Sequence, residues 1–422
     1  MTAVTPFRAL RYDTTRVELS KVIVPPYDVI AGDERGSFFD RDPHNAIRFE
    51  LTRDVADEET TDYAELADTL AAWQQSGVLA RDAAPAFYVM RQQFTAPDGR
   101  PLARIGFFAE LGLCEYEQRI VRPHEFTMAG PKADRLKLLR AARANLSSVF
   151  MLYEDREQAL AEVLAGALEE DVLSHAEDDA GVQYTLAAIT EPRSIGIVQD
   201  FLAERPVVIA DGHHRYETAL AYRREMRERY GHEGGPWEST LAYFANLYAP
   251  GSLLLPIHRV VKRGVENAVL REKLSAWSCN AAKVDADGSD IAAVLEAHLA
   301  PHAGTPAFAA DDGSGELLVF WRDEPLGDDL MVRILETEIL GGVFGLDADD
   351  LREGAVLFPK SSPRAAEEAR ANAQAIALYL NPMSPDDVFR VTEAGERMPQ
   401  KSTFFSPKVP TGLVFRIHAE SR

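Results

Sequence analysis

The middle of the chain alternates short apolar runs with segments of helical periodicity. Apolar or β-branched runs predict strands at 86–113 (two strands joined by the APDGR turn), 118–127, 147–155, 181–190, 205–210, 241–248 and 253–261. Apolar residues at helical spacing predict helices over 60–80, with Gly77 as its stop, and over 132–144, 157–173 and 216–230. Strands that alternate with helices indicate an α/β (α+β) fold, a mixed sheet with helical cover.

The two ends of the chain carry weaker patterns. Residues 21–30 (KVIVPPYDVI) predict a strand broken by Pro25 and Pro26, because proline cannot donate to a ladder. Beyond residue 265 the pattern predicts helices at 269–277, 290–300, 328–340 and 362–380 and a strand at 315–322. The tail, 398–418, predicts a polar loop that closes on a strand. We therefore expect two domains, 1–265 and 266–422.

Composition narrows the function. The 422-residue chain has 67 acidic and 45 basic residues and a formal net charge of −22, which argues against nucleic acid as the main partner. Its cysteines, Cys114 and Cys279, form no CxxC pair, so neither a zinc knuckle nor a disulfide framework is indicated. No run approaches the roughly 18 apolar residues of a membrane span, and the first residues show no apolar signal region. We expect a cytoplasmic protein without membrane partners; its oligomeric state is left open.

The segment VVIADGHHRYETALAYR (207–223) carries the densest polar chemistry. It places polar residues between the end of a buried strand and the first turn of a helix, where free N–H groups and the helix dipole favour anions. Gly212 permits close approach of the backbone to a ligand. His213, His214 and Arg215 add donors, and arginine can grip phosphate oxygens bidentately. The segment predicts a phosphate-binding turn.

Asp211 is the one acid in this turn. It can cap the helix, bind Mg²⁺ or orient a histidine. The plainer reading of the whole turn is a capped helix with incidental surface histidines. Zinc is less favoured, because adjacent side chains rarely point at one ion and the chain has no HExxH motif.

The segment ADGHHRYETALAYR resembles the signature of a widespread bacterial family of unknown function. The resemblance extends to VIVPPYDVI, DPHNAIRFEL, RPHEFT, LLLPIHRVV and MPQKSTFFSPKVPTGLV, and so covers nearly the whole chain. DGHHR is also similar to the phosphate-binding turn of ParB/sulfiredoxin-like proteins, a superfamily that includes free L-serine kinases using ADP, ATP or pyrophosphate. The resemblance implies a ParB/sulfiredoxin-like catalytic core within 1–265. The C-terminal α+β region then completes the site or braces the sheet.

The resemblance also implies catalytic roles. Glu125, at the tip of RPHEFT (122–127), matches in character the glutamate that such kinases use as general base on the substrate hydroxyl. A base must lie within hydrogen-bond reach of that hydroxyl. Asp211 and His214 are the other catalytic candidates, and Asp211 is the candidate ligand of Mg²⁺.

Binding candidates come from several segments. Those for the donor phosphates are Lys132 and Arg135, in the first turn of a basic helix, with Gly212, His213, His214 and Arg215. Those for the substrate are Tyr27, Asp28, His124, His258, Lys401, Ser402 and Thr403, the last three in a proline-bounded loop that also holds Lys408. Structural roles are the alternatives. Lys132 and Arg135 can belong to a solvated basic helix face, and Tyr27 and Asp28 can belong to a turn with an Asp cap. The loop at 400–408 can be anchored to the core by its phenylalanines.

The preferred hypothesis is a Mg²⁺-dependent phosphotransferase. It moves a phosphoryl group from ATP, ADP or pyrophosphate to a small hydroxylated substrate, and free L-serine is preferred by resemblance alone. No Walker A or kinase glycine-rich loop is present, so the 211–215 turn must be the phosphate cradle. The alternatives are a non-catalytic nucleotide sensor of ParB-like type, and a metal-dependent phosphoesterase that uses the histidines.

Overall fold

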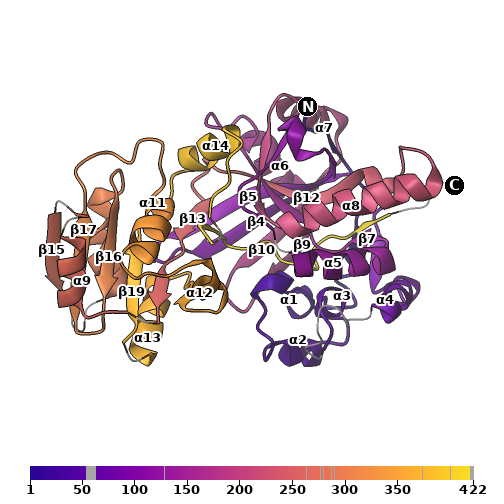
Figure 1. Cartoon of the computed structure of the whole chain (residues 1–422). Helices are drawn as coiled ribbons and strands as arrows, with labels where there is room; N and C mark the ends of the chain where they lie inside the picture. The colour runs from indigo at the N-terminus through magenta and orange to yellow at the C-terminus, as the bar shows by residue number, and fades with distance from the viewer. Residues whose placement is uncertain are drawn as a thin grey trace. The chain divides into compact units, whose positions relative to one another are not determined.

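The structure is a computed structural model in which these residues are described: 1–53, 63–127, 129–262, 264–275, 277–278, 280–286, 288, 290–372, 374–399 and 401–418. Cys279 and the first residues of the helix expected at 60–80 lie outside them. The chain forms two compact units (Figure 1). The first holds Met1–Leu253, Thr392–Arg397 and Pro407–Arg422, and the second holds Leu254–Val391 and Met398–Ser406.

A large mixed sheet organises the first unit, which confirms the expected mixed sheet with helical cover. Across the sheet the strands are β6 (Val121–Pro123), β11 (Val207–Asp211), β8 (Val149–Tyr153), β12 (Ser239–Asn246), β5 (Pro101–Gly112), β4 (Phe87–Thr95), β10 (Gln183–Ile189) and β9 (Val172–Glu177), and β1 (Val4–Thr5) pairs with β5. The pairs β6–β11 and β8–β12 are parallel and the others antiparallel. All residues of β8 are buried, as its unbroken apolar run requires.

Three helices cover one face of this sheet. They are α6 (Ala161–Glu170), α7 (Pro192–Ala203) and α8 (His213–Tyr230), and α5 (Ala129–Ala142) lies along α8 (Figure 1). Their apolar side chains, such as Leu164, Leu202 and Leu220, share one buried core with Phe107 and Phe244 of the sheet. Burial of this apolar surface is what holds the helices in place.

Short elements complete the first unit. They are α1 (Leu19–Val22), η1 (Tyr27–Val29), α2 (Arg35–Arg41), α3 (Ile47–Glu50), α4 (Ala64–Gln75), η2 (Tyr116–Gln118) and η3 (Pro236–Glu238), with the strand pairs β2 (Leu10–Tyr12)–β3 (Leu79–Arg81) and β7 (Ala144–Asn145)–β21 (Arg416–Ile417). The tail is tied to the start of the chain, because the backbones of Leu10 and Phe415 exchange two hydrogen bonds of 2.9 Å.

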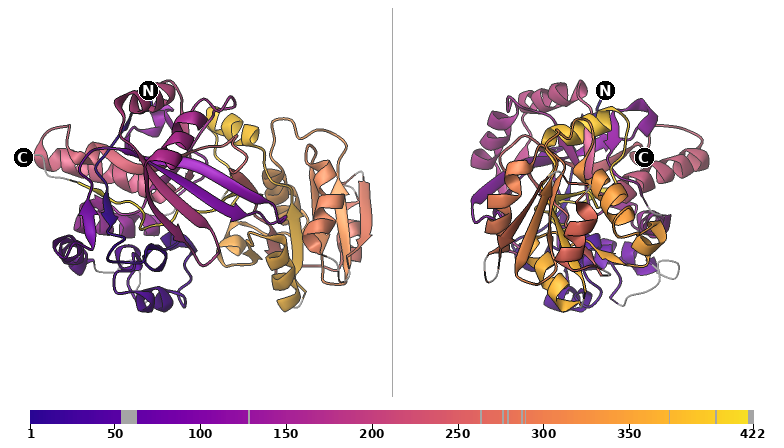
Figure 2. Two further views of the ribbon diagram at one scale, coloured as in Figure 1. Left: turned by 180° about the vertical axis from the view of Figure 1, so that it is seen from behind. Right: turned by 60° about the vertical axis from the view of Figure 1, so that its left-hand side comes forward.

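The second unit is built on an antiparallel sheet with helices on both sides (Figure 2). Its strand order is β15 (Asn280–Asp285), β17 (Glu316–Trp321), β16 (Ala307–Asp311), β19 (Ile376–Leu380), β14 (Arg259–Val261) and β18 (Val356–Leu357), and β13 (Leu253–Pro256) pairs with β20 (Thr403–Ser406). One face packs against α9 (Asn267–Leu274), α11 (Met331–Ile334) and the π-helical η5 (Leu335–Gly341), and the other against α10 (Ile291–His298) and α13 (Ser362–Ala371). The remaining helices are η4 (Ala300–His302), α12 (Ala348–Arg352) and α14 (Pro385–Glu393).

Several expected elements are wrong in type or extent. The expected helix over 362–380 ends at Ala371, and Ile376–Leu380 form a fully buried central strand, because a short apolar run without polar positions suits the middle of a sheet. Half of the broken strand expected at 21–30 lies in α1 and η1, and Val24 between them forms a single antiparallel bridge to Thr411. The helix expected from Tyr216 begins at His213, and β9 was not expected at all. Within the described ranges no helix is long and apolar enough to cross a membrane.

Candidate functional site

The turn between β11 and α8 is set by Gly212. Its φ of 86° lies in the left-handed region, which suits glycine, and a Cβ there would lie 2.9 Å from Nε of Arg215. The helix therefore starts directly after the strand, so His213, His214 and Arg215 form its first turn. The free N–H groups of this turn make the N-terminal end of an 18-residue helix that favours anions.

Asp211 is the centre of a buried ion-pair cluster. Its Oδ2 accepts from Nη2 of Arg215 at 2.6 Å, and its Oδ1 accepts from Nζ of Lys408. Arg215 also donates to the carbonyl of Ser148. Burial raises the pKa of Asp211, but the cations of Lys408 and Arg215 outweigh burial and hold that pKa well below its usual range. Asp211 is thus a permanent anion that positions Arg215 and Lys408.

This pairing does not fit the expected role of Asp211 as a Mg²⁺ ligand. Each carboxylate oxygen already accepts from a cation, so a metal ion would have to compete with Arg215 and Lys408 for the one negative charge of Asp211. Among the residues that the structure describes, no three His, Cys, Asp or Glu side chains are grouped so as to hold a metal ion. Arg215 likewise donates to Asp211 and Ser148 through Nη2 and Nη1, while its Nε is buried and has no hydrogen-bond partner among the described residues.

His213 is a buried neutral imidazole. Its Nε2 accepts from the backbone N–H of His124 at 3.3 Å, so the proton of the neutral ring is on Nδ1. The rings of His124 and His213 pack edge to face with centroids 4.7 Å apart. Burial, with His124 beside it, lowers the pKa of His213 to about 3. His213 therefore stays neutral at physiological pH and contributes its backbone N–H, not a charge.

The buried histidines predict a pH dependence of stability. His213 has a folded-state pKa of about 3 and His258 one of about 4, both below the ordinary value near 6.5. Their contribution is therefore present above about pH 6.5 and is lost as pH falls, at about 1.4 kcal/mol per pH unit for each histidine. We expect urea unfolding at pH 7.5 and 5.5 to show this loss.

The variant His213→Gln isolates one part of that dependence. Its loss of stability between pH 7.5 and 5.5 should be smaller than that of the parent by about 1 kcal/mol. His175→Gln, at an exposed histidine on β9, is the matched variant. An unchanged pH dependence in His213→Gln would contradict the buried neutral state.

Glu125 reaches the same edge of the sheet by a different strand. β6 runs parallel to β11, with Pro123 opposite Ile209, so both strands end side by side. His124 Nδ1 lies 2.5 Å from the carbonyl of Ile209 and donates to it, because a carbonyl only accepts. Oε1 of Glu125 lies 3.5 Å from His124 Nε2, and its side chain is 23% exposed. Glu125 is thus an accessible carboxylate beside the first turn of α8.

Lys132 and Glu217 join α5 to α8 at this edge. Nζ of Lys132 donates to Oε2 of Glu217 at 2.9 Å, and Oγ1 of Thr127 donates to the same oxygen at 2.8 Å. Burial lowers the pKa of His214, and Lys132 lowers it further against the opposing effect of Glu217. Glu217 was not among the sequence candidates, yet it lies one helical turn after His213 and His214, a spacing that puts it on the same face.

A cavity of about 420 Å³ opens beside the Lys132–Glu217 pair. Tyr116 and Arg397 also line it, and the Tyr116 ring stacks on Tyr216 with centroids 5.6 Å apart. Its volume is in the range of small-molecule sites. Its walls combine an aromatic face with paired cations and anions, which suits a small polar substrate.

Arg135 and Tyr27 form a second buried cluster. The guanidinium of Arg135 lies 4.2 Å from the centre of the Tyr27 ring and donates to Glu50, Tyr63 and Asp134. Arg135 is therefore a buried ion-pair residue, and we leave it out of the phosphate-binding set. Asp28, next to Tyr27, is exposed, and its carboxylate raises the pKa of Arg215 and His214 as a secondary effect, which places it near the turn.

Four candidates belong to the second unit. His258 is buried, and its Nδ1 accepts from the backbone N–H of Leu380 at 3.3 Å. Ser402 donates to the carbonyl of Pro399 at 2.5 Å, Thr403 is buried at the start of β20, and Lys401 is exposed with a φ of 60°. Lys408 follows the loop of Lys401, Ser402 and Thr403 but belongs to the first unit, where it contacts Asp211 of the 211–215 turn.

Several solved structures resemble the chain at low identity. A free serine kinase in complex with AMP is 12% identical, with a TM-score of 0.34, over 73% of this chain and 92% of that one. A conserved hypothetical protein from Pyrococcus furiosus is 12% identical, with a TM-score of 0.34, over 74% and 95%. SbnI with a C-terminal truncation from Staphylococcus aureus is 10% identical, with a TM-score of 0.35, over 71% and 84%.

No curated protein sequence matches the chain. The model of one protein family does, over residues 4–314, and that family is described as a protein of unknown function (DUF1015). These residues include the DGHHR turn, Glu125 and Lys132. Since the match spans most of the sequence, the chain belongs to the DUF1015 family.

Proposed function

We propose that this protein is a small-molecule kinase, which transfers a phosphoryl group from ATP, ADP or pyrophosphate to a small hydroxylated substrate, with free L-serine preferred. The observation that carries the proposal is the meeting of Glu125, Lys132 and the N-terminal turn of α8 at one edge of the sheet. Phosphoryl transfer needs a site that binds the donor phosphates, a cation that stabilises their charge and a carboxylate that accepts the proton of the hydroxyl.

The donor phosphates are assigned to the first turn of α8. The free N–H groups of His213 and His214 and the positive end of the helix dipole attract the phosphate oxygens. Lys132 adds the positive charge, and the Asp211–Arg215 pair holds the backbone of the turn in place. Preorganised donors of this kind stabilise the charge of the transferring group.

The acceptor is assigned to the 420 Å³ cavity beside Lys132 and Glu217. In this assignment Glu217 pairs with the ammonium group of the amino acid, and Glu125 accepts the proton of the attacking hydroxyl. In the proposal Mg²⁺ is bound together with the phosphate donor. The exposed carboxylate of Asp28 is the protein group assigned to bind it. His258, Ser402 and Thr403 are left out, because their side chains serve the packing of the second unit.

Labelled donors test the proposal. The purified protein is incubated with terminally labelled ATP, ADP or pyrophosphate, Mg²⁺ and a panel of serine, threonine, homoserine and alanine, and the products are separated for labelled phosphoamino acids. We expect O-phosphoserine from at least one donor and no product with alanine, which lacks a hydroxyl. Nucleotide binding without product from any pair would favour the sensor over the kinase.

A further inference from the structure

One cation of the acceptor cavity has no part in the proposed reaction. Three cations and three carboxylates line this cavity of about 420 Å³: Lys132, Arg224, Arg397, Glu115, Glu117 and Glu217. Lys132 donates to Glu217 at 2.9 Å, and Arg224 donates to Glu115 at 2.7 Å. The contacts that the described residues offer to Arg397 are two aromatic rings, not a carboxylate.

These rings hold the guanidinium of Arg397 at the cavity. Its Cζ lies 4.8 Å from the centre of the Phe126 ring and 5.7 Å from that of Tyr116, both within the about 6 Å over which a ring attracts a cation. Arg397 belongs to the segment Thr392–Arg397, which is part of the first unit, and it is half-buried. A ring contacts the flat face of a guanidinium, so the N–H groups in its plane are left to donate to a ligand.

Phe126 connects Arg397 with the carboxylates of the proposed site. It lies between Glu125, the assigned base, and Thr127, whose hydroxyl donates to Oε2 of Glu217 at 2.8 Å. Lys132 donates to the same oxygen, so among the described residues both bonds to Glu217 leave its Oε1 for a ligand. The cavity therefore offers one cation and one carboxylate oxygen to what it binds.

The charge of the lining separates two classes of ligand. Three positive and three negative side chains give the cavity a net charge of zero. A polyphosphate needs an excess of positive charge, whereas a zwitterion needs one group of each sign. The balance therefore favours a ligand that carries both an ammonium group and a carboxylate.

We propose that Arg397 binds the carboxylate of an α-amino acid, whose ammonium group pairs with Oε1 of Glu217. Arginine suits this role because its planar fork can hold both oxygens of a carboxylate. The inference rests on the proposed function, to which it adds the residue that selects an α-amino acid over other small alcohols.

Three matched ligands test the inference on the full chain, by calorimetry or ligand-observed NMR. They are L-serine, ethanolamine, which lacks the carboxylate, and 3-hydroxypropionate, which lacks the ammonium group. Each is titrated with and without AMP, so that a site completed by the donor is also detected. We expect L-serine to bind with a Kd of about 1 mM or below and the other two at least about tenfold more weakly. Binding of L-serine no tighter than that of ethanolamine under both conditions would overturn the proposal.

The variant Arg397→Gln isolates the carboxylate contact. It should weaken L-serine by at least about tenfold and leave ethanolamine unchanged, because only L-serine has a carboxylate to lose. An equal weakening of both ligands, or an unchanged affinity for L-serine, would contradict the assignment.

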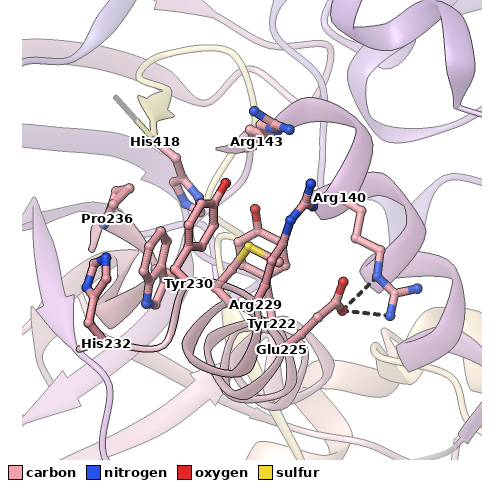
Figure 3. A pocket seen from close by; sticks show the side chains of 11 residues that line it. Arg140, Arg143, Tyr222, Glu225, Arg229, Tyr230, His232, Pro236 and His418 are labelled. Carbon is pink, nitrogen blue, oxygen red and sulfur yellow. Dashed lines mark hydrogen bonds and ion pairs between the residues drawn. The ribbon is translucent and has the colours of Figure 1, made fainter. Parts of the chain in front are cut away.

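Arg229→Gln is the matched control. Arg229 is exposed and lines a separate cavity of about 450 Å³ at the C-terminal end of α8 (Figure 3). Its guanidinium also lies beside a tyrosine ring, 5.7 Å from the centre of Tyr230. The control therefore removes a similar cation from another place and should change neither affinity.

Turnover separates this inference from the proposed function. In the labelled-donor assay, Arg397→Gln should raise the KM for serine by at least about tenfold and change kcat little. A raised KM for the donor with an unchanged KM for serine assigns Arg397 to the donor phosphates and overturns this inference alone. No phosphoserine from the parent, with the binding pattern above intact, contradicts the kinase and leaves the amino-acid site in place.

Discussion

Asp211→Ala should lower the free energy of unfolding by about 3–5 kcal/mol at pH 7, because it leaves two buried cations without their counter-ion. The side chains of Asp211, Arg215 and Lys408 are only 13%, 11% and 16% exposed, so water cannot replace the lost carboxylate. The measurement is urea unfolding followed by fluorescence, with Asp200→Ala, at an exposed aspartate of α7, as the control.

The pH and a second substitution sharpen this test. Because the pKa of Asp211 is lowered, its contribution is present above the unfolded-state value near 4 and is lost as pH falls below it. Adding Lys408→Met to Asp211→Ala should restore part of the stability, since it removes one of the orphaned cations. A double variant whose loss equals the sum of the single losses would show that the pair is not coupled.

Glu125→Gln should reduce phosphoamino-acid formation by about 10²–10⁴-fold, while the Kd for the donor nucleotide changes little. The amide keeps the size of the side chain but cannot accept the proton of the hydroxyl. Turnover and nucleotide affinity are measured on the same preparation, and Glu162→Gln, at an exposed glutamate of α6, is the control.

The pH profile separates a base from a residue that only positions the substrate. If Glu125 is the base, the residual rate of Glu125→Gln should lose the acidic limb of the parent profile. A full rate in Glu125→Gln removes the base assignment, and Glu217, also at this edge, becomes the carboxylate to test. Because donor binding is measured separately, this result would not contradict the assignment of the donor phosphates to the first turn of α8.

The sequence predicted the strand–turn–helix of the DGHHR segment well, because each part has a local cause. β11 is a short buried run, Gly212 supplies the left-handed turn, and the helical periodicity follows at once. Membership in a family of unknown function was also predicted from this segment and is confirmed. The relation to ParB/sulfiredoxin-like proteins stays a prediction.

What the sequence missed depends on partners far away in the chain. Arg215 was predicted to bind phosphate, and the structure pairs it with Asp211, four residues earlier in the same turn, whereas the second cation on Asp211 is Lys408, 197 residues further on. Arg135 likewise meets Glu50, 85 residues earlier. The position of an arginine in the sequence does not show whether its side chain pairs with a carboxylate of the protein or binds an anionic ligand, since both uses need a cation at that place.

The segment that forms β19 was predicted as helix for a related reason. Its five apolar residues follow the helix α13 after a short connection, so periodicity alone reads them as a continuation of that helix. Their partners are β14 and β16, which lie more than sixty residues earlier in the chain. Strand pairing over such separations is invisible to a local pattern.

The last residues of the chain pack into the first unit, and this affects the order in which the two units can fold during synthesis. Lys408 contacts Asp211, Thr411 donates to Glu50 at 2.9 Å, and Phe415 is hydrogen-bonded to Leu10. On the ribosome, residues 1–253 emerge before residues 407–418 are made, so Asp211 has Arg215 but lacks Lys408, and Glu50 has Arg135 but lacks Thr411, until the end of the chain is synthesised. The second unit, by contrast, needs only about 150 consecutive residues, and its folding can precede the closure of the unit that was synthesised first.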